Sequence, residues 1–244
     1  DTLYKMSSSR KYFVGFVLMM SALAMAQVAP DAAQLLEKLR LAHGGEALAS
    51  LRTYQETATL TTFSGPQVEN QLTVVSYVDF PSKRLRLEYR DGPRLIQVLQ
   101  VSPAGGQSWS AISGSKALEP ALTKELRDGL YQTWYGIRLG GSGREMARIL
   151  GRRTFGDVSG LAVEVGTQGS KTIYLVGAQN QLIAERYQNS QGQLTVLYSD
   201  LRLVAGIRIP FRARIYADGV LFAEVKVQQA RVNPPLEPKT FRMP

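Results

Sequence analysis

The strongest constraint on the fold is an alternation of apolar and polar residues between positions 208 and 228. Two stretches there alternate with a period of two, which is typical of strands that bury one face. Asp218-Gly219 separates them and favours a tight reversal, because Gly accepts the positive φ that such turns need. The apolar face of this predicted hairpin consists of Ile209, Phe211, Ala213, Ile215, Leu221, Ala223, Val225 and Val227. A hairpin of this kind needs neighbouring strands and a cover for its apolar side.

Upstream segments supply those neighbours, because they alternate in the same way and are joined by short turns. The predicted strands lie at residues 54–63, 68–80, 85–90, 95–101, around Trp109, and at 161–165, 171–176, 182–188 and 194–201. About ten antiparallel strands in sequence cannot stay flat, since native twist curls them. The sequence therefore predicts an α+β fold, with a curved half-barrel or incomplete antiparallel β-barrel.

Two predicted helices could cover the concave face of this sheet. The first begins near Asp31 and ends at Gly44-Gly45, with leucines on one face. The second spans residues 118–137, where large apolar residues recur every four positions between charged ones. Those residues are Leu118, Leu122, Leu126, Leu130 and Trp134. Gly140 is expected to end this inserted helix, and Arg144–Leu150 is expected to form one more helical segment.

Length and composition indicate one exported domain. A chain of 244 residues that is 44% hydrophobic can bury a sizeable core. Residues 1–26 form a predicted leader and signal peptide, in which Met6–Ala26 contains a basic start, an apolar run and a small-x-small cleavage site. A retained N-terminal anchor is the alternative, but the run is shorter than the ~20 residues that span a bilayer. Residues 27–244 are predicted to be a single domain, and the periplasm is the expected location.

The net charge narrows the classes of expected partner, and the cysteine content indicates how the fold is stabilised. The formal net charge is +9, which favours anionic surfaces such as lipid headgroups. Nucleic acid is not expected, since the basic residues are spread along strands and do not form one block. The chain contains no cysteine, so its stability must come from its core and not from disulfides.

No constellation of catalytic residues is evident, and we expect neither an enzyme nor a cofactor or metal. His43 is the only histidine. It could act as a metal ligand or as a base near Glu46, but one histidine does not make a usual metal site. A structural role at a helix end fits it better. Ser113–Lys116 matches S-x-x-K, yet its partner motifs are degraded and out of order. Gly140–Gly143 lacks the Lys-Ser/Thr of a phosphate-binding loop. The acids Glu164, Glu185 and Glu224 lie on different predicted strands.

Aromatic residues gather around the inserted helix, namely Trp109, Tyr131, Trp134 and Tyr135. They could be ordinary core, or they could line a cavity for an acyl chain. On the second interpretation, the apolar cavity is lined by Leu122, Leu126, Leu130, Trp134, Ile209, Phe211, Ile215 and Val225. A separate charged face of Arg208, Arg212 and Arg214 would meet an anionic headgroup or an acidic partner, or would simply be solvated.

Several short segments resemble the LolA/LolB-like superfamily of bacterial envelope proteins, whose type members carry lipoproteins through the periplasm. Phe80-Pro81 before residues 85–89 resembles the family's Pro-turn and Arg-rich strand. Further resemblances are Ile173-Tyr174-Leu175 before 182–186, Tyr198-Ser199-Asp200 before 205–210, and Thr240–Pro244. The resemblance implies an incomplete barrel plugged by helices around an apolar cavity. The family carrier has an arginine where this chain has Phe80, so only the shape and the ligand class are carried over.

These observations support two main hypotheses. The first is a monomeric, non-enzymatic periplasmic binder or carrier of lipid or lipoprotein acyl chains, with contact to a membrane surface as a further expectation. The alternative is an envelope sensor or scaffold that binds a protein partner through the same fold. A large apolar hollow beneath the inserted helix favours the first, and a sheet face filled by the protein's own side chains favours the second.

Overall fold

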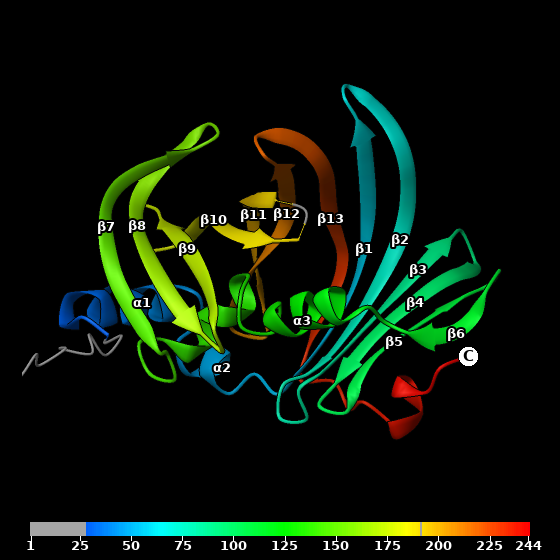
Figure 1. The fold of residues 1–244 in the computed structure, drawn as a ribbon. Coiled ribbons are helices and arrows are strands. Elements are labelled where there is room, and N and C mark those ends of the chain that lie inside the picture. Colours follow the sequence, from blue (N-terminus) through cyan, green and yellow to red (C-terminus); the bar gives the residue numbers. More distant parts are fainter. Residues whose placement is uncertain (1–27, 191) are drawn as a thin grey trace, which may run out of the picture.

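The computed structural model describes residues 28–190 and 192–244, and the predicted signal peptide lies outside them. Its strands form one antiparallel sheet that curves strongly and stays open (Figure 1). In spatial order the sheet runs β6-β5-β4-β3-β2-β1-β13-β12-β11-β10-β9-β8-β7. The strands are β1 (Thr53–Ser64), β2 (Gln67–Asp79), β3 (Arg84–Asp91), β4 (Arg94–Ser102), β5 (Gly105–Ser110), β6 (Gly114–Ala117), β7 (Met146–Phe155), β8 (Val158–Thr167), β9 (Ser170–Val176), β10 (Leu182–Asn189), β11 (Gly192–Val204), β12 (Ile207–Ala217) and β13 (Val220–Val232).

The predicted C-terminal hairpin is confirmed as β12 and β13. Arg212 pairs with Lys226 and Ala213 with Val225, and the reversal at Asp218-Gly219 uses positive φ angles of 47° and 84°. β13 also pairs with β1, from Tyr54↔Val232 to Thr62↔Ala223. The hairpin therefore lies in the middle of the sheet, where it joins the N-terminal meander to the C-terminal one.

The predicted fold class is confirmed, but the sheet has 13 strands where about ten were expected. The two that sequence reasoning missed flank the inserted segment. β6 is a short exposed strand, and β7 occupies the region expected to be helical at Arg144–Leu150. β7 is a strand because Ala147 opposes Val165 on β8, while Arg148 forms a cross-strand ion pair with Glu164.

The continuous helix predicted over residues 118–137 is wrong. The segment forms α3 (Pro120–Asp128), then irregular turns, then the 3₁₀ helix η1 (Trp134–Leu139). Thr133 has a φ of +57°, which no helix allows. Arg138 donates to the carbonyl oxygens of Leu130 in the turns and of Tyr135 in η1, so one side chain satisfies backbone acceptors in both segments.

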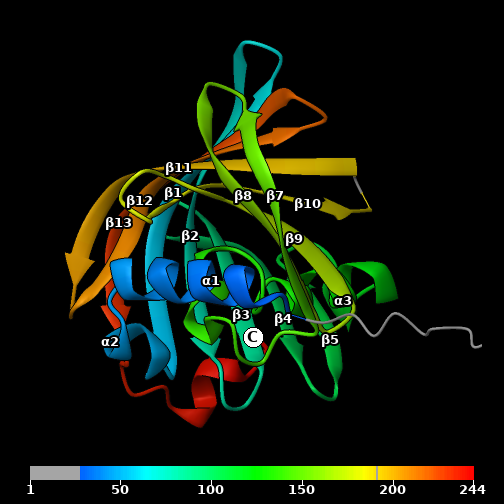
Figure 2. The same cartoon turned by 90° about the vertical axis from the view of Figure 1, so that its left-hand side faces the viewer.

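The main core lies between the concave face of the sheet and a layer formed by α1 (Pro30–Ala42), α2 (Glu46–Ala49) and η1. Figure 2 shows α1 crossing below the arch of the sheet. Leu35, Leu36 and Leu39 of α1 are buried, as the predicted helical face requires. A second apolar cluster, centred on Phe155, Leu175 and Leu197, covers the opposite face of the β8–β11 region. Strands in this region are therefore buried on both faces. A final 3₁₀ turn, η2 (Pro238–Phe241), buries Phe241.

His43 fastens α1 to the sheet. Its Nδ1 lies 2.8 Å from the carbonyl oxygen of Arg208, so Nδ1 must carry the hydrogen, and its Nε2 accepts a 2.9 Å bond from the Leu182 amide. The ring is fully buried, and burial is the main cause that lowers the pKa of His43 below its ordinary value. His43 is a structural residue at a helix end, held as the neutral imidazole.

We expect acid to weaken this fastening. A lowered pKa in the folded state means that the stability His43 contributes is present above its unfolded pKa of about 6.5 and is lost as pH falls further. His43→Leu should lower the free energy of unfolding at pH 7.5 by roughly 2–4 kcal/mol, since two buried backbone groups lose partners. Urea unfolding followed by circular dichroism at pH 7.5 and pH 5 measures this. If the variant lost as much stability between the two pH values as the native chain does, titration of His43 would not be the cause.

Candidate functional site

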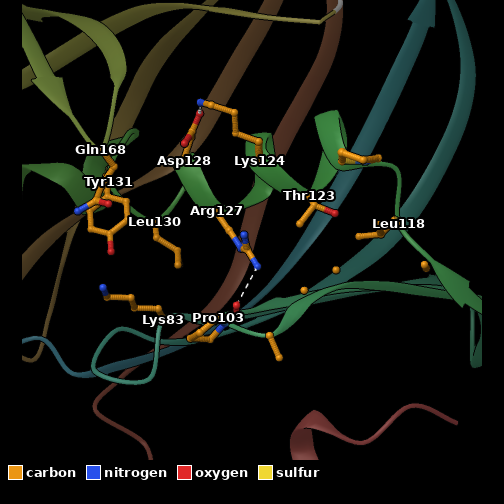
Figure 3. A pocket seen from close by; sticks show the side chains of 15 residues that line it. Lys83, Pro103, Leu118, Thr123, Lys124, Arg127, Asp128, Leu130, Tyr131 and Gln168 are labelled. Carbon is orange, nitrogen blue, oxygen red and sulfur yellow. Dashed lines mark hydrogen bonds and ion pairs between the residues drawn. The ribbon is translucent and has the colours of Figure 1, made fainter.

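A large hollow lies between α3 and the turn that joins β4 to β5. It has a volume of about 910 Å³, which is within the range of pockets that bury small ligands. Figure 3 shows α3 on one side of it and the Pro103 turn on the other. We call it the α3 cavity. It is lined by Lys83, Pro103, Ala104, Gly105, Gly106, Ala117, Leu118, Pro120, Thr123, Lys124, Arg127, Asp128, Leu130, Tyr131 and Gln168.

Apolar and basic groups divide the wall of the α3 cavity. Leu118, Leu130 and Tyr131 supply large apolar surfaces, while Lys83, Lys124 and Arg127 supply positive charge. Arg127 reaches across the cavity and donates to the carbonyl oxygen of Ser102 at 2.6 Å (Figure 3). Asp128 is the one acid on the wall, and its carboxylate is paired with Lys124 at 2.6 Å. The arrangement suits a molecule with an apolar body and an anionic end.

α3 is held loosely for a helix that covers a sheet. Thr123 is its only buried residue. Leu126 is partly buried against the main core. Further links to the surroundings are polar, such as Glu125 accepting from the Ser190 amide and Lys124 donating to Ser170. A second hollow of about 230 Å³ borders the opposite side of α3, where Leu122 and Leu126 line it. Hollows on two sides leave this helix with little of the packing that stabilises most amphipathic helices.

A third hollow of about 160 Å³ opens on the concave face of the central strands. We call it the carboxylate cavity, because Glu56 of β1 and Glu185 of β10 both line it. Its remaining wall is aromatic and aliphatic, and no lysine or arginine contributes to it. The other lining residues are Thr133, Trp134, Tyr135, Tyr187, Val196, Tyr198, Pro210, Ala213, Ile215, Val225 and Val227.

Burial changes the titration of both carboxyl groups. Glu56 accepts a 2.7 Å hydrogen bond from the Tyr54 hydroxyl, and burial nevertheless raises its pKa to about 7. Glu185 is 0% exposed, and burial raises its pKa to about 8. Loss of water disfavours the charged form of an acid. Both groups therefore exchange protons near neutral pH, unlike ordinary surface glutamates.

The residues predicted to form one cavity are distributed over four places. Leu130 lines the α3 cavity, and Leu122 and Leu126 line the hollow on the other side of α3. Trp134, Ile215 and Val225 line the carboxylate cavity. Ile209 and Phe211 are packed in the main core. The breaking of the predicted helix at Thr133 accounts for this separation, because Leu130 and Trp134 no longer share a helical face.

The predicted basic face is mostly occupied by intramolecular ion pairs. Arg212 pairs with Glu224 and Arg214 with Asp157, each at 3.1 Å. Arg208 is exposed, and its backbone is bonded to His43. The basic residues that border the α3 cavity are instead on α3 and on the β2–β3 turn. Sequence reasoning could not find Lys83 there, because nothing in the sequence places that turn opposite α3.

The aromatic cluster differs in part from the predicted one. Trp134 and Tyr135 pack with Tyr54, whose ring centroid is 5.1 Å from that of Trp134, and Phe80 packs against Tyr135. Trp109 lies apart on β5. Phe80 also lies under the guanidinium group of Arg138, 4.0 Å from the ring centroid. A cation–π contact therefore fixes η1 to the residue that follows β2.

Other sequence motifs form no site. Ser113 and Lys116 lie in the exposed β5–β6 hairpin, where Ser113 bonds Ser110. Gly140–Gly143 ends η1, and Gly141 packs closely on Ala33 of α1. Across residues 28–190 and 192–244, no three potential ligands gather to hold a metal ion. In the same residues no helix has the length and apolar character to cross a bilayer.

Glu185 is expected to make the protein less stable as pH rises. Because its folded pKa is raised, the stability that it contributes is complete below its unfolded pKa of 4.5 and disappears as pH rises through about 8. One pKa unit corresponds to about 1.4 kcal/mol. Between pH 4.5 and pH 9 the native chain loses this stability and Glu185→Gln does not. The difference in unfolding free energy between the variant and the native chain should therefore shift by roughly 2–5 kcal/mol in favour of the variant.

The matched control is Glu164→Gln, which removes a carboxylate from an exposed ion pair with Arg148. Exposed pairs contribute about 0.2–1 kcal/mol, so this variant should follow the native pH profile. Denaturant titrations at four pH values compare the three proteins. A Glu185→Gln profile parallel to the native one would contradict the assignment.

Comparisons with known proteins identify the fold. No protein-family model matches the chain, and no curated protein matches it. Among solved structures, a DUF1329 family protein from Desulfovibrio piger superposes with a TM-score of 0.62 at 10% identity, covering 88% of this chain and 98% of that one.

Two further structures share the architecture. A candidate outer membrane lipoprotein-sorting protein domain from Vibrio parahaemolyticus has a TM-score of 0.57 at 8% identity, with 86% of this chain and 96% of that chain covered. A LolA superfamily protein from Nitrosomonas europaea has a TM-score of 0.56 at 12% identity, with 86% and 97% covered. The chain has a LolA-like fold, in which an open, curved antiparallel sheet is crossed by helices.

Proposed function

We propose that this protein binds the acyl chain of a lipid or lipoprotein in the α3 cavity and carries it without chemical change. The observation that carries the proposal is the hollow of about 910 Å³ beneath a loosely packed helix, with apolar walls and a basic rim. We place the protein in the periplasm, after export by the signal peptide predicted at Met6–Ala26. The names of two structures with this fold, a LolA superfamily protein and a lipoprotein-sorting domain, agree with this proposal.

The hydrophobic effect would supply most of the affinity. Each methylene group that leaves water contributes about 0.8 kcal/mol, so burial of six to eight groups offsets much of the cost of immobilising a ligand. Leu118, Leu130 and Tyr131 provide the surface for this contact. The acyl chain of the ligand would lie along α3, in contact with the β4–β5 turn.

The basic rim would select the headgroup. Lys83 lies on the β2–β3 turn and Arg127 on α3, and both line the same hollow. Nε and Nη2 of Arg127 already donate to the carbonyl oxygens of Ser102 and Pro103. No intramolecular ion pair is found for Lys83 among the described residues. Lys83 is therefore the group best placed to meet a phosphate or carboxylate.

Filling the cavity should abolish binding. Ala117 lines the α3 cavity from an exposed position on β6, so Ala117→Trp places an indole in the hollow without disturbing the core. Ala111→Trp is the matched control, because Ala111 is also exposed but lies in the β5–β6 turn outside the cavity. Native mass spectrometry after expression with the signal peptide should find lipid on the native chain and on Ala111→Trp, and at least tenfold less on Ala117→Trp. Equal loading of all three proteins would contradict the assigned cavity.

A cross-link can determine whether α3 must move. A Cβ atom on Gly106 would meet the Thr123 side chain, so Gly106→Cys with Thr123→Cys brings two thiols within disulfide range in a chain that has no other cysteine. Because the α3 cavity is already open, the oxidised protein should bind a fluorescent fatty acid within threefold of the reduced protein. A loss of binding on oxidation that dithiothreitol restores would show that displacement of α3 is required.

The alternative is an envelope sensor or scaffold that binds a protein partner. One observation favours it, namely that α1, α2 and η1 fill much of the concave face with buried side chains. A pull-down that recovers one envelope protein, together with lipid-free protein in native mass spectrometry, would support this function over the carrier.

A further inference from the structure

Glu185 is a buried acid whose carboxylate has little to compensate for its loss of water. Its side chain is 0% exposed, and neither carboxylate oxygen has a hydrogen-bond partner within 3.5 Å. The Tyr198 hydroxyl and the Thr133 backbone act in the opposite direction to burial and favour the ionised form by hydrogen bonding, but burial outweighs both. An unpaired carboxyl group in an apolar wall costs folding free energy. This group lines the carboxylate cavity.

Strand pairing aims the carboxyl group of Glu185 into that cavity. Glu185 lies opposite Val196 on β11, which in turn lies opposite Ile215 on β12. Directly opposed residues point to the same face of a sheet, and all three residues line the hollow. The acid therefore belongs to the concave wall beside the cavity, and its buried oxygens come into contact with a ligand when the side chains that cover them shift.

Aromatic rings surround this acid. Trp134, Tyr135, Tyr187 and Tyr198 all line the same hollow. Electron-rich ring faces attract cations, and cages of such rings recognise ammonium groups. An anionic group among aromatic rings is therefore a binding environment for an organic cation.

No cation of the described residues fills that role. Arg138 donates to the carbonyl oxygens of Leu130 and Tyr135 and lies over Phe80. Arg144 donates to the Gly136 carbonyl oxygen and the Thr167 hydroxyl. Neither lines the carboxylate cavity, and the second charged residue that does, Glu56 of β1, is also an acid. The charge missing from this hollow is positive.

We propose that the carboxylate cavity binds a small hydrophobic amine, with Glu185 as the anionic partner of its ammonium group. The volume of about 160 Å³ is close to that of an engineered cavity of 150 Å³ that holds benzene, so the apolar part has the size of one ring. This site takes the opposite charge from the basic α3 cavity and is separate from the lipid function proposed above.

The groups facing Glu185 predict how binding depends on pH. Tyr174, Tyr187 and Tyr198 have pKa values raised above the ordinary value, so they stay neutral through pH 9. Glu185 and Glu56 are the two groups on the wall that titrate near neutrality. A cation requires ionised Glu185, so its affinity should rise with pH up to about 8 and then level off.

Three benzyl compounds test the proposal by isothermal titration calorimetry on the full chain. Benzyltrimethylammonium keeps its charge at every pH, benzylamine is a primary amine, and benzyl alcohol is neutral and similar in size. At pH 8.5 both cations should bind at least tenfold more tightly than the alcohol. The affinity for benzyltrimethylammonium should fall at least tenfold between pH 8.5 and pH 6. Equal affinities for the cations and the alcohol would overturn the proposal.

Two variants locate the site. Glu185→Gln should remove the tenfold preference for cations, and Glu164→Gln should retain it, because Glu164 is paired with Arg148 at the protein surface. If Glu185→Gln does not fold, Ala213→Phe fills the same hollow while keeping the acid, and it should abolish binding of all three compounds. Cation preference that survives in folded Glu185→Gln, or binding that survives in Ala213→Phe, would refute the site.

The same variants separate this site from the lipid function. Ala117→Trp fills the α3 cavity and should leave the binding of benzyltrimethylammonium unchanged, since Ala117 does not line the carboxylate cavity. Glu185→Gln should leave lipid loading unchanged for the converse reason. Failure of one proposal can therefore be recognised without affecting the other.

Discussion

The pairing of β1 with β13 is the interaction on which the whole sheet depends. It joins two antiparallel meanders, β1–β6 and β7–β13, that would otherwise be separate sheets. Twist accumulates across the joined strands, and the result is one surface whose concave side is too large for a single helix to cover. The hollows described above are a consequence of that mismatch between a wide curved sheet and short covering elements.

Covering elements differ in how tightly they pack. α1 is fixed by four buried apolar residues and by the two hydrogen bonds of His43, and η1 is fixed by aromatic contacts with Tyr54. α3 buries one residue and borders hollows on two sides. The tightly packed elements α1 and η1 and the loosely packed α3 thus lie on the same face of the sheet. Both candidate binding sites lie at the edges of the tightly packed region. Local packing density of this kind also sets which parts of a protein open most easily.

The local periodicity of apolar and polar residues predicted the strands well, but it predicted the candidate binding cavities poorly. Alternation at residues 208–228 and the Asp218-Gly219 turn identified the central hairpin, because the period of two is a direct result of backbone geometry. The four-residue spacing from Leu118 to Trp134 suggested one helix, yet tertiary contacts of Arg138 and the left-handed Thr133 interrupt it. Glu185 could be assigned to a strand, but that no arginine of the described residues forms an ion pair with it depends on packing between distant strands. Burial of an acid leaves no trace in a sequence when its neighbours come from elsewhere in the chain.

The central position of β13 also determines when the molecule can become complete. Tyr54 opposes Val232, so the closing ladder joins residues nearly 180 positions apart. Contacts of such long separation form slowly, since the loop between them must be ordered first. Each meander can collapse early on its own hairpins, but the common concave surface cannot exist before residue 232 has been synthesised and has docked. A chain of this topology therefore stays in two loosely associated halves until β13 has paired with β1.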